Sequence, residues 1–159
     1  MDYDKTASSY NRLYKEEQLK KLKAIEKILN VRKEDYLLDI GSGTGISTNY
    51  FKCNCFGLDP SFKMLKFSKD LKVCGYAENL PFKENTFDII IAVTSFHNFI
   101  DFRKAILEIK RVSKKNAKIV ITVMKKSSYL EQITDLIKEN FIFETIEEEK
   151  DIIFYGNLM

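Results

Sequence analysis

The segment "LLDIGSGTGIST", residues 37–48, constrains the fold of this chain more than any other stretch. A short apolar run containing one acidic residue, Asp39, ends in three closely spaced glycines, Gly41, Gly43 and Gly45. The apolar run predicts a strand that is buried on both faces of a sheet. Glycine adopts backbone angles closed to other residues and lets a ligand lie against bare main chain, and the following helix offers unpaired amides. The segment therefore predicts a ligand-binding loop at the carboxyl end of a strand.

Strand-like apolar runs alternate with helical patterns along the rest of the chain. The last two β-prone runs, 141–149 and 151–159, are too close together for a helical crossover, so we expect an antiparallel hairpin. The other expected strands are 36–40, 55–59, 71–76, 87–93 and 117–123, and the expected helices are 15–29, 62–70, 102–112 and a segment around 130–137.

This order of elements predicts an α/β fold. Alternating strands and helices favour a parallel sheet with helices on both faces, and the terminal hairpin adds one reversed strand near the edge. We expect a single domain over 1–159, because the length suits one core and no linker or repeat interrupts the pattern. The lysines of the first helix, which alternate with glutamates, are expected to form its solvated face.

Composition restricts the class of protein only loosely. The net charge of +3 is spread along the chain, so it neither requires nor forbids an anionic partner. No stretch approaches the roughly 20 apolar residues of a membrane span and no signal peptide is recognisable, so we expect a cytoplasmic protein. An odd number of cysteines, Cys53, Cys55 and Cys74, argues against a disulfide framework.

The glycine spacing discriminates between cofactors. A dinucleotide fingerprint has the spacing GxGxxG, whereas Ile46 occupies the place of the last glycine here, which counts against a nicotinamide cofactor. Asp39, two residues before the first glycine, suits a ligand with a cationic part. Asp59 ends the second strand, where a carboxylate can accept hydrogen bonds from both ribose hydroxyls. S-adenosylmethionine has a ribose, an ammonium and a sulfonium.

At these residues the chain resembles the class I S-adenosylmethionine-dependent methyltransferases, and most closely the small-molecule branch that includes the ubiquinone and menaquinone biosynthesis methyltransferases. The resemblance covers nearly the whole chain through "YLLDIGSGTG", "GLDPS" followed by Met64, "GYAENLPFKENTFDIIIAVTSFHNF" and "AKIVIT". It implies a Rossmann-like, doubly wound, seven-stranded and mostly parallel sheet with an antiparallel C-terminal strand.

The resemblance also implies roles for individual residues. Residues 1–14 resemble the family's lid over the core at 15–159, with Tyr10 over the methionine end as a cofactor contact and candidate catalytic residue. Tyr76 stands where the family usually has an Asp that accepts from the adenine amino group. The implied cofactor contacts are Asp39, Gly41, Ser42 and Gly43 for the methionine end, Asp59 for the ribose, Pro60, Met64, Ala77 and Glu78 for the adenine, and Val93 and Thr94 for the ammonium.

His97, the only histidine, is a candidate proton acceptor or substrate contact at the end of the fourth strand, because its ordinary pKa of about 6.5 suits that role. The alternative is a structural role, with the ring packed between Phe96 and Phe99. The three cysteines could bind a soft metal, or arsenic as in the related arsenite methyltransferases, but buried small apolar side chains are the more common role of cysteine, and we expect no metal.

The sequence therefore predicts methyl transfer from S-adenosylmethionine to a small-molecule acceptor whose identity it does not reveal. Few residues are left to roof the acceptor site, so we expect either the lid segment 1–14 or a partner, a second copy or a macromolecule, to complete it. A non-catalytic S-adenosylmethionine-binding module and an NAD(P)-dependent oxidoreductase are the alternatives. Nucleic acid is a disfavoured substrate, because no RNA-binding module is appended.

Overall fold

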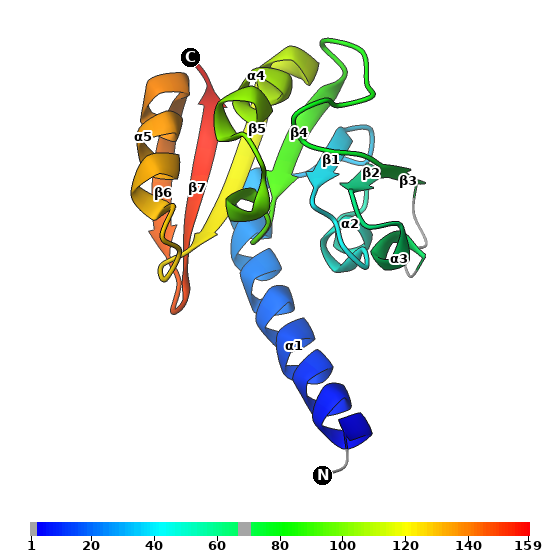
Figure 1. The fold of residues 1–159 in the computed structure, drawn as a ribbon. Coiled ribbons are helices and arrows are strands. Elements are labelled where there is room, and N and C mark those ends of the chain that lie inside the picture. The colour runs from blue at the N-terminus through cyan, green and yellow to red at the C-terminus, as the bar shows by residue number, and fades with distance from the viewer. Residues whose placement is uncertain (1–2, 67–70) are drawn as a thin grey trace.

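The computed structural model describes residues 3–66 and 71–159, with side chains from Arg12 onward. Seven strands and their helices follow one another as the sequence predicts (Figure 1). The helices are α1 (Tyr3–Leu29), α2 (Ile46–Tyr50), α3 (Phe62–Leu65), the short 3-10 helix η1 (Phe96–Asn98), α4 (Phe102–Val112) and α5 (Leu130–Asn140). The strands are β1 (Tyr36–Ile40), β2 (Asn54–Asp59), β3 (Leu71–Cys74), β4 (Phe87–Ala92), β5 (Ser113–Met124), β6 (Phe141–Glu147) and β7 (Asp151–Leu158).

All seven strands form one sheet with the order β3-β2-β1-β4-β5-β7-β6. β1 to β5 pair in parallel, whereas β7 is antiparallel to both β5 and β6. The predicted Rossmann-like sheet with a reversed strand near its edge is thereby confirmed. The strand order reverses between β1 and β4, and ligands of open α/β sheets bind beyond the carboxyl ends of strands at such a point.

Two apolar layers hold the helices against the sheet. Alternate residues of β1 and β4 face opposite sides, so α4 and α5 cover one face while α1 covers the other (Figure 1). Each fully buried Leu or Ile side chain contributes about 1.5–3 kcal/mol. The first layer includes Leu38, Ile40 and Ile90 with Ile106, Ile109 and Ile133, and the second includes Leu37, Ile89 and Ile91 with Leu22, Ile25 and Leu29.

The helix α1 extends beyond the sheet. Its C-terminal half packs in the second apolar layer, and its N-terminal half continues past the carboxyl ends of the parallel strands (Figure 1). The helix begins at Tyr3, twelve residues earlier than the apolar stripe predicts. No helix in residues 3–66 and 71–159 is long and apolar enough to cross a membrane.

Two other boundaries differ from the sequence prediction. β5 begins at Ser113, directly after α4 and four residues earlier than predicted, because an irregularity in its pairing with β4 accommodates the extra residues. β3 ends at Cys74, so Gly75 and Tyr76 lie beyond it in the loop toward β4.

Candidate functional site

The loop between β1 and α2 requires its glycines. Gly41, Gly43 and Gly45 have φ angles of 77°, 54° and 90°, in the left-handed region that L side chains rarely adopt. A Cβ atom on Gly41 would lie 2.4 Å from the Cβ of Ser95, whose hydroxyl donates to the carbonyl of Ile40 at 2.7 Å. The backbone of the loop therefore lies directly against the residues that follow β4.

The carboxylate of Asp39 is completely buried beneath this loop. Its Oδ2 accepts hydrogen bonds from the hydroxyls of Ser47 at 2.5 Å and Thr48 at 2.7 Å, whereas its Oδ1 has no hydrogen-bond partner among the described residues. Burial raises the pKa of Asp39 to about 6, although the two hydroxyls oppose this rise and the charge of Asp59 adds to it. A buried carboxylate with an unpaired oxygen favours a cationic group nearby.

The carboxylate of Asp59 connects two loops. Its Oδ2 accepts from the amide of Gly43 at 3.0 Å, and its Oδ1 accepts from the amide of Ser61 at 2.8 Å. A carboxylate has about four lone-pair sites, so each oxygen can accept one more hydrogen bond. Met64 lies close to the glycine loop, since its Cε would be 3.6 Å from a Cβ atom on Gly43. Pro60, which follows Asp59, is exposed.

A cavity of about 1090 Å³ lies between the glycine loop and α1. Of the residues that the sequence suggests as cofactor contacts, the structure brings five together in its wall, and α1 and α2 supply most of the others. The predicted residues are Gly41, Ser42, Gly43, Met64 and Val93, and the additional ones include Tyr14, Lys15, Gln18 and Leu19 of α1 and Ile46, Ser47 and Tyr50 of α2.

The remaining predicted contacts with described side chains do not line this cavity. Ala77 is buried, and Oε1 of Glu78 accepts from the amides of Ile100 at 2.6 Å and Asp101 at 3.1 Å, so this carboxylate holds the loop before α4. Thr94 has a φ of 53°, and its hydroxyl accepts from Lys21 at 2.6 Å. The side chain of Tyr10 lies outside the described residues.

His97 lies on η1 and is half-buried. Its Nδ1 is buried and has no hydrogen-bond partner among the described residues. Burial lowers the pKa of His97 below its ordinary value, while the charge of Asp151 opposes this shift and that of Lys21 adds to it. The rings of Phe96 and Phe99 contact each other, with their centroids 4.8 Å apart. The ring of His97 is therefore not packed between them, as the structural alternative suggested.

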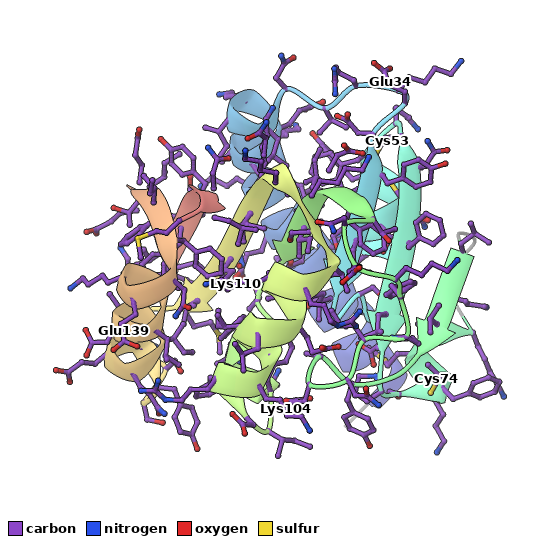
Figure 2. All side chains as sticks on the ribbon, turned by 90° about the horizontal axis from the view of Figure 1, so that it is seen from above. Glu34, Cys53, Cys74, Lys104, Lys110 and Glu139 are labelled. Carbon is purple, nitrogen blue, oxygen red and sulfur yellow. The ribbon has the colours of Figure 1, made fainter. Side chains whose placement is uncertain are left out.

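The three cysteines do not converge on one site. Cys53 and Cys55 are neighbours with 3.3 Å between their sulfur atoms, whereas Cys74 lies on β3 near Pro60. Figure 2 shows Cys53 and Cys74 far apart in the view. Within residues 3–66 and 71–159 no group of three or more His, Cys, Asp or Glu residues could hold a metal ion.

Sequence reasoning missed several residues of the site. The hydroxyls of Ser47 and Thr48 were a recognisable signal, because they follow the glycines in "GIST" and can point back from the next helix. Lys21 gave no such signal. It was expected on the solvated face of its helix, but the structure buries it with 3% of its side chain exposed, because it pairs with Asp151 of β7.

Comparisons with known proteins agree with this geometry. The family described as a methyltransferase domain matches residues 38–121. An uncharacterized protein of Methanocaldococcus jannaschii is 34% identical over 145 residues, which are 87% of this chain and 57% of the relative. Demethylmenaquinone methyltransferase of Thermotoga maritima is 38% identical over 109 residues, 62% of this chain and 47% of the relative. The chain thus spans about half the length of the curated relatives it matches.

A solved structure extends the similarity to the fold. A SAM-dependent methyltransferase from Thermotoga maritima superimposes with a TM-score of 0.77 at 21% identity, covering 99% of this chain and 98% of the other. The matched family covers more than half of the chain and includes the glycine loop, Asp59 and the strands around them. This protein therefore belongs to the class I S-adenosylmethionine-dependent methyltransferases.

Proposed function

We propose that this protein binds S-adenosylmethionine against the glycine loop and transfers its methyl group to a small-molecule acceptor. The observation that carries the proposal is the unpaired oxygen of Asp39, a completely buried carboxylate beneath a loop of bare backbone. Such an oxygen fits a ligand with an ammonium and a sulfonium better than it fits a pyrophosphate. The third glycine, Gly45, lies one position before the last glycine of the dinucleotide fingerprint GxGxxG, which supports the same choice.

The residues around the cavity suit this cofactor. Asp39 and the loop residues Gly41, Ser42 and Gly43 hold the methionine end, and the hydroxyl of Ser42 is buried with no hydrogen-bond partner among the described residues. Asp59 holds the ribose through its remaining lone pairs. The other proposed contacts are Pro60, Met64, Ala77 and Glu78 around the adenine, and Val93 and Thr94 near the ammonium.

Bound S-adenosylmethionine would supply an activated methyl group for an acceptor nucleophile, with S-adenosylhomocysteine as the other product. The protein contributes alignment of the two reactants and exclusion of water. His97 serves as the proton acceptor or as a contact to the acceptor, because its lowered pKa keeps the ring neutral at pH 7.

We further propose that the N-terminal part of α1 covers the acceptor side of the site. Tyr14, Lys15 and Gln18 already line the cavity, so residues 1–14 act as a lid, with Tyr10 placed over the methionine end. A second copy of the chain or a macromolecular partner is the alternative roof.

Calorimetry tests the cofactor. The wild type should bind S-adenosylhomocysteine but neither NAD nor NADP, and Asp59→Ala should bind S-adenosylhomocysteine at least tenfold more weakly. Asp135→Ala, which removes an exposed carboxylate on α5, is the matched control and should bind like the wild type. A wild type that fails to bind S-adenosylhomocysteine contradicts the proposal. Binding without transfer to any of a panel of small nucleophiles would favour a binding module instead.

A further inference from the structure

A buried ion pair joins the first helix to the last strand. Nζ of Lys21 on α1 lies 2.6 Å from Oδ2 of Asp151, the first residue of β7, and only 3% of each side chain is exposed. Moving two charges out of water costs several kcal/mol per ion, and the attraction between them offsets that cost only with good geometry and further hydrogen bonds. A pair that served only to attach the helix could be replaced by apolar side chains without loss.

Lys21 makes the additional hydrogen bond toward the cavity. Its Nζ donates to Oγ1 of Thr94 at 2.6 Å. Thr94 is 73 positions away in the sequence and follows Val93, the first residue after β4. The amide of Thr94 in turn donates to the hydroxyl of Thr122 on β5 at 2.7 Å. Two elements, α1 and β5, therefore hold Thr94 through hydrogen bonds.

The backbone at Thr94 needs such support. Its φ of 53° is in the left-handed region, which is a genuine outlier for a β-branched residue. Strained backbone of this kind costs about 1–3 kcal/mol and persists only where surrounding contacts hold it in place. The residue before it, Val93, lines the cavity, and so does Gln18, one turn before Lys21 on α1. Lys21 thus connects two walls of the cavity.

A second ion pair at the same junction provides a contrast. Nζ of Lys150 lies 2.8 Å from Oε2 of Glu17, and 62% of the lysine side chain and 38% of the glutamate side chain are exposed. This pair also links α1 to the end of the sheet that carries β7, but no hydrogen bond in the described residues extends from it to β4. Attachment of the helix alone therefore does not explain the contact between Lys21 and Thr94.

From these contacts we infer that Lys21 is a positioning residue for the cofactor site, which acts through Thr94 and is held in place by Asp151. The ammonium keeps the backbone after β4 in the conformation that completes the cavity wall, and it couples that conformation to the placement of α1. This inference rests on the proposed function, because the cavity must be the S-adenosylmethionine site. It predicts that cofactor affinity depends on Lys21 separately from the stability of the fold.

A double substitution separates the two roles. Lys21→Met should lower the thermal unfolding temperature, because it leaves Asp151 buried without its cation, and should raise the Kd for S-adenosylhomocysteine at least tenfold. Lys21→Met combined with Asp151→Asn removes both charges, so it should recover at least half of the lost unfolding temperature. Its Kd should nevertheless stay at least tenfold above that of the wild type.

Glu17→Gln is the matched control, since it breaks only the exposed pair, and it should change neither measurement. Thr94→Val, which keeps the Lys21–Asp151 pair but removes the acceptor hydroxyl, should also weaken S-adenosylhomocysteine binding. A double variant that binds S-adenosylhomocysteine like the wild type overturns the positioning role and leaves a structural one. If the wild type itself does not bind S-adenosylhomocysteine, the proposed function fails and this inference fails with it.

Discussion

The backbone amide of Gly43 donates to Oδ2 of Asp59 at 3.0 Å, so one carboxylate holds the glycine loop against the end of β2. The other oxygen accepts from the amide of Ser61. Both loops that face the proposed cofactor thereby depend on a single side chain. A carboxylate can accept from several donors at once through both of its terminal atoms, which an amide side chain cannot do.

Asp59→Asn is expected to weaken S-adenosylhomocysteine binding by roughly 10- to 100-fold. The substitution makes one terminal atom a donor, which faces the amide of Gly43 or of Ser61, and removes charge-assisted hydrogen bonds worth about 1.5–3 kcal/mol each. Calorimetry at pH 7.5 measures the effect. Asp101→Asn, which alters the N-cap of α4, should leave the Kd within about twofold, and equal losses in both variants would contradict a specific role for Asp59.

Gly41→Ala is expected to destabilise the protein by about 2–4 kcal/mol. The φ of 77° costs an L residue roughly 1–2 kcal/mol, and the contact of its Cβ with Ser95 adds the cost of overpacking. Urea unfolding measures the change. Gly75→Ala is the control, because the φ there is not in the left-handed region and the nearest atom, Cδ1 of Leu58, is 3.3 Å away. A loss below about 1 kcal/mol at Gly41 would show that this position of the loop does not require glycine.

The affinity for S-adenosylhomocysteine is expected to fall as the pH is lowered through about 6. Asp39 has a pKa of about 6 in the folded protein, so protonation removes the negative charge that we propose stabilises the ligand's ammonium. At pH 5 only about a tenth of the carboxyl is ionised, so binding should be roughly tenfold weaker than at pH 7. Calorimetry from pH 5 to pH 8 tests this, and Asp39→Asn should show a flat profile. A wild-type profile as flat as that of the variant would count against the role of Asp39.

The same carboxyl affects stability with the opposite pH dependence. Its folded pKa of about 6 lies above the ordinary value of 3.8 that it has in the unfolded chain, so the folded state retains a proton that the unfolded state loses. The contribution of Asp39 to stability therefore falls as the pH rises from about 4 to 6 and is constant above that range. Relative to Asp39→Asn, the wild type should lose about 2.4 kcal/mol between pH 4 and pH 7, as measured by urea unfolding.

Deletion of residues 1–14 is expected to abolish methyl transfer and to leave a folded core. The apolar contacts of α1 come from Leu22, Ile25 and Leu29, which remain, whereas Tyr14 is removed from the cavity wall. Circular dichroism checks the fold, and release of S-adenosylhomocysteine in the presence of acceptor measures transfer. Unchanged transfer would disprove the lid and favour a partner that completes the site.

Much of the fold could be predicted because its determinants are local. Burial on both faces makes β1 and β4 continuous apolar runs, and the cap at Asp101 accepts from the amide of Lys104 as its position before the helix suggests. Boundaries were less predictable. β5 begins at Ser113 because pairing with β4 extends the strand into a polar segment that has no strand signal of its own.

The amino-acid sequence by itself determined the order of strands along the chain, the position of the glycine loop, and the position of the carboxylates Asp39 and Asp59 at the ends of strands. Each of these features depends on neighbours within a few positions. Only the tertiary structure decided which side chains meet across the sheet. In the folded protein the carboxylate of Glu78 accepts a hydrogen bond from the loop before α4, and Lys21 is buried between Thr94 and Asp151. The physical reason is that the sequence around a charged residue of an amphipathic helix is the same whether its side chain is exposed to water or paired with a buried partner. Chain segments far apart in sequence decide between the two.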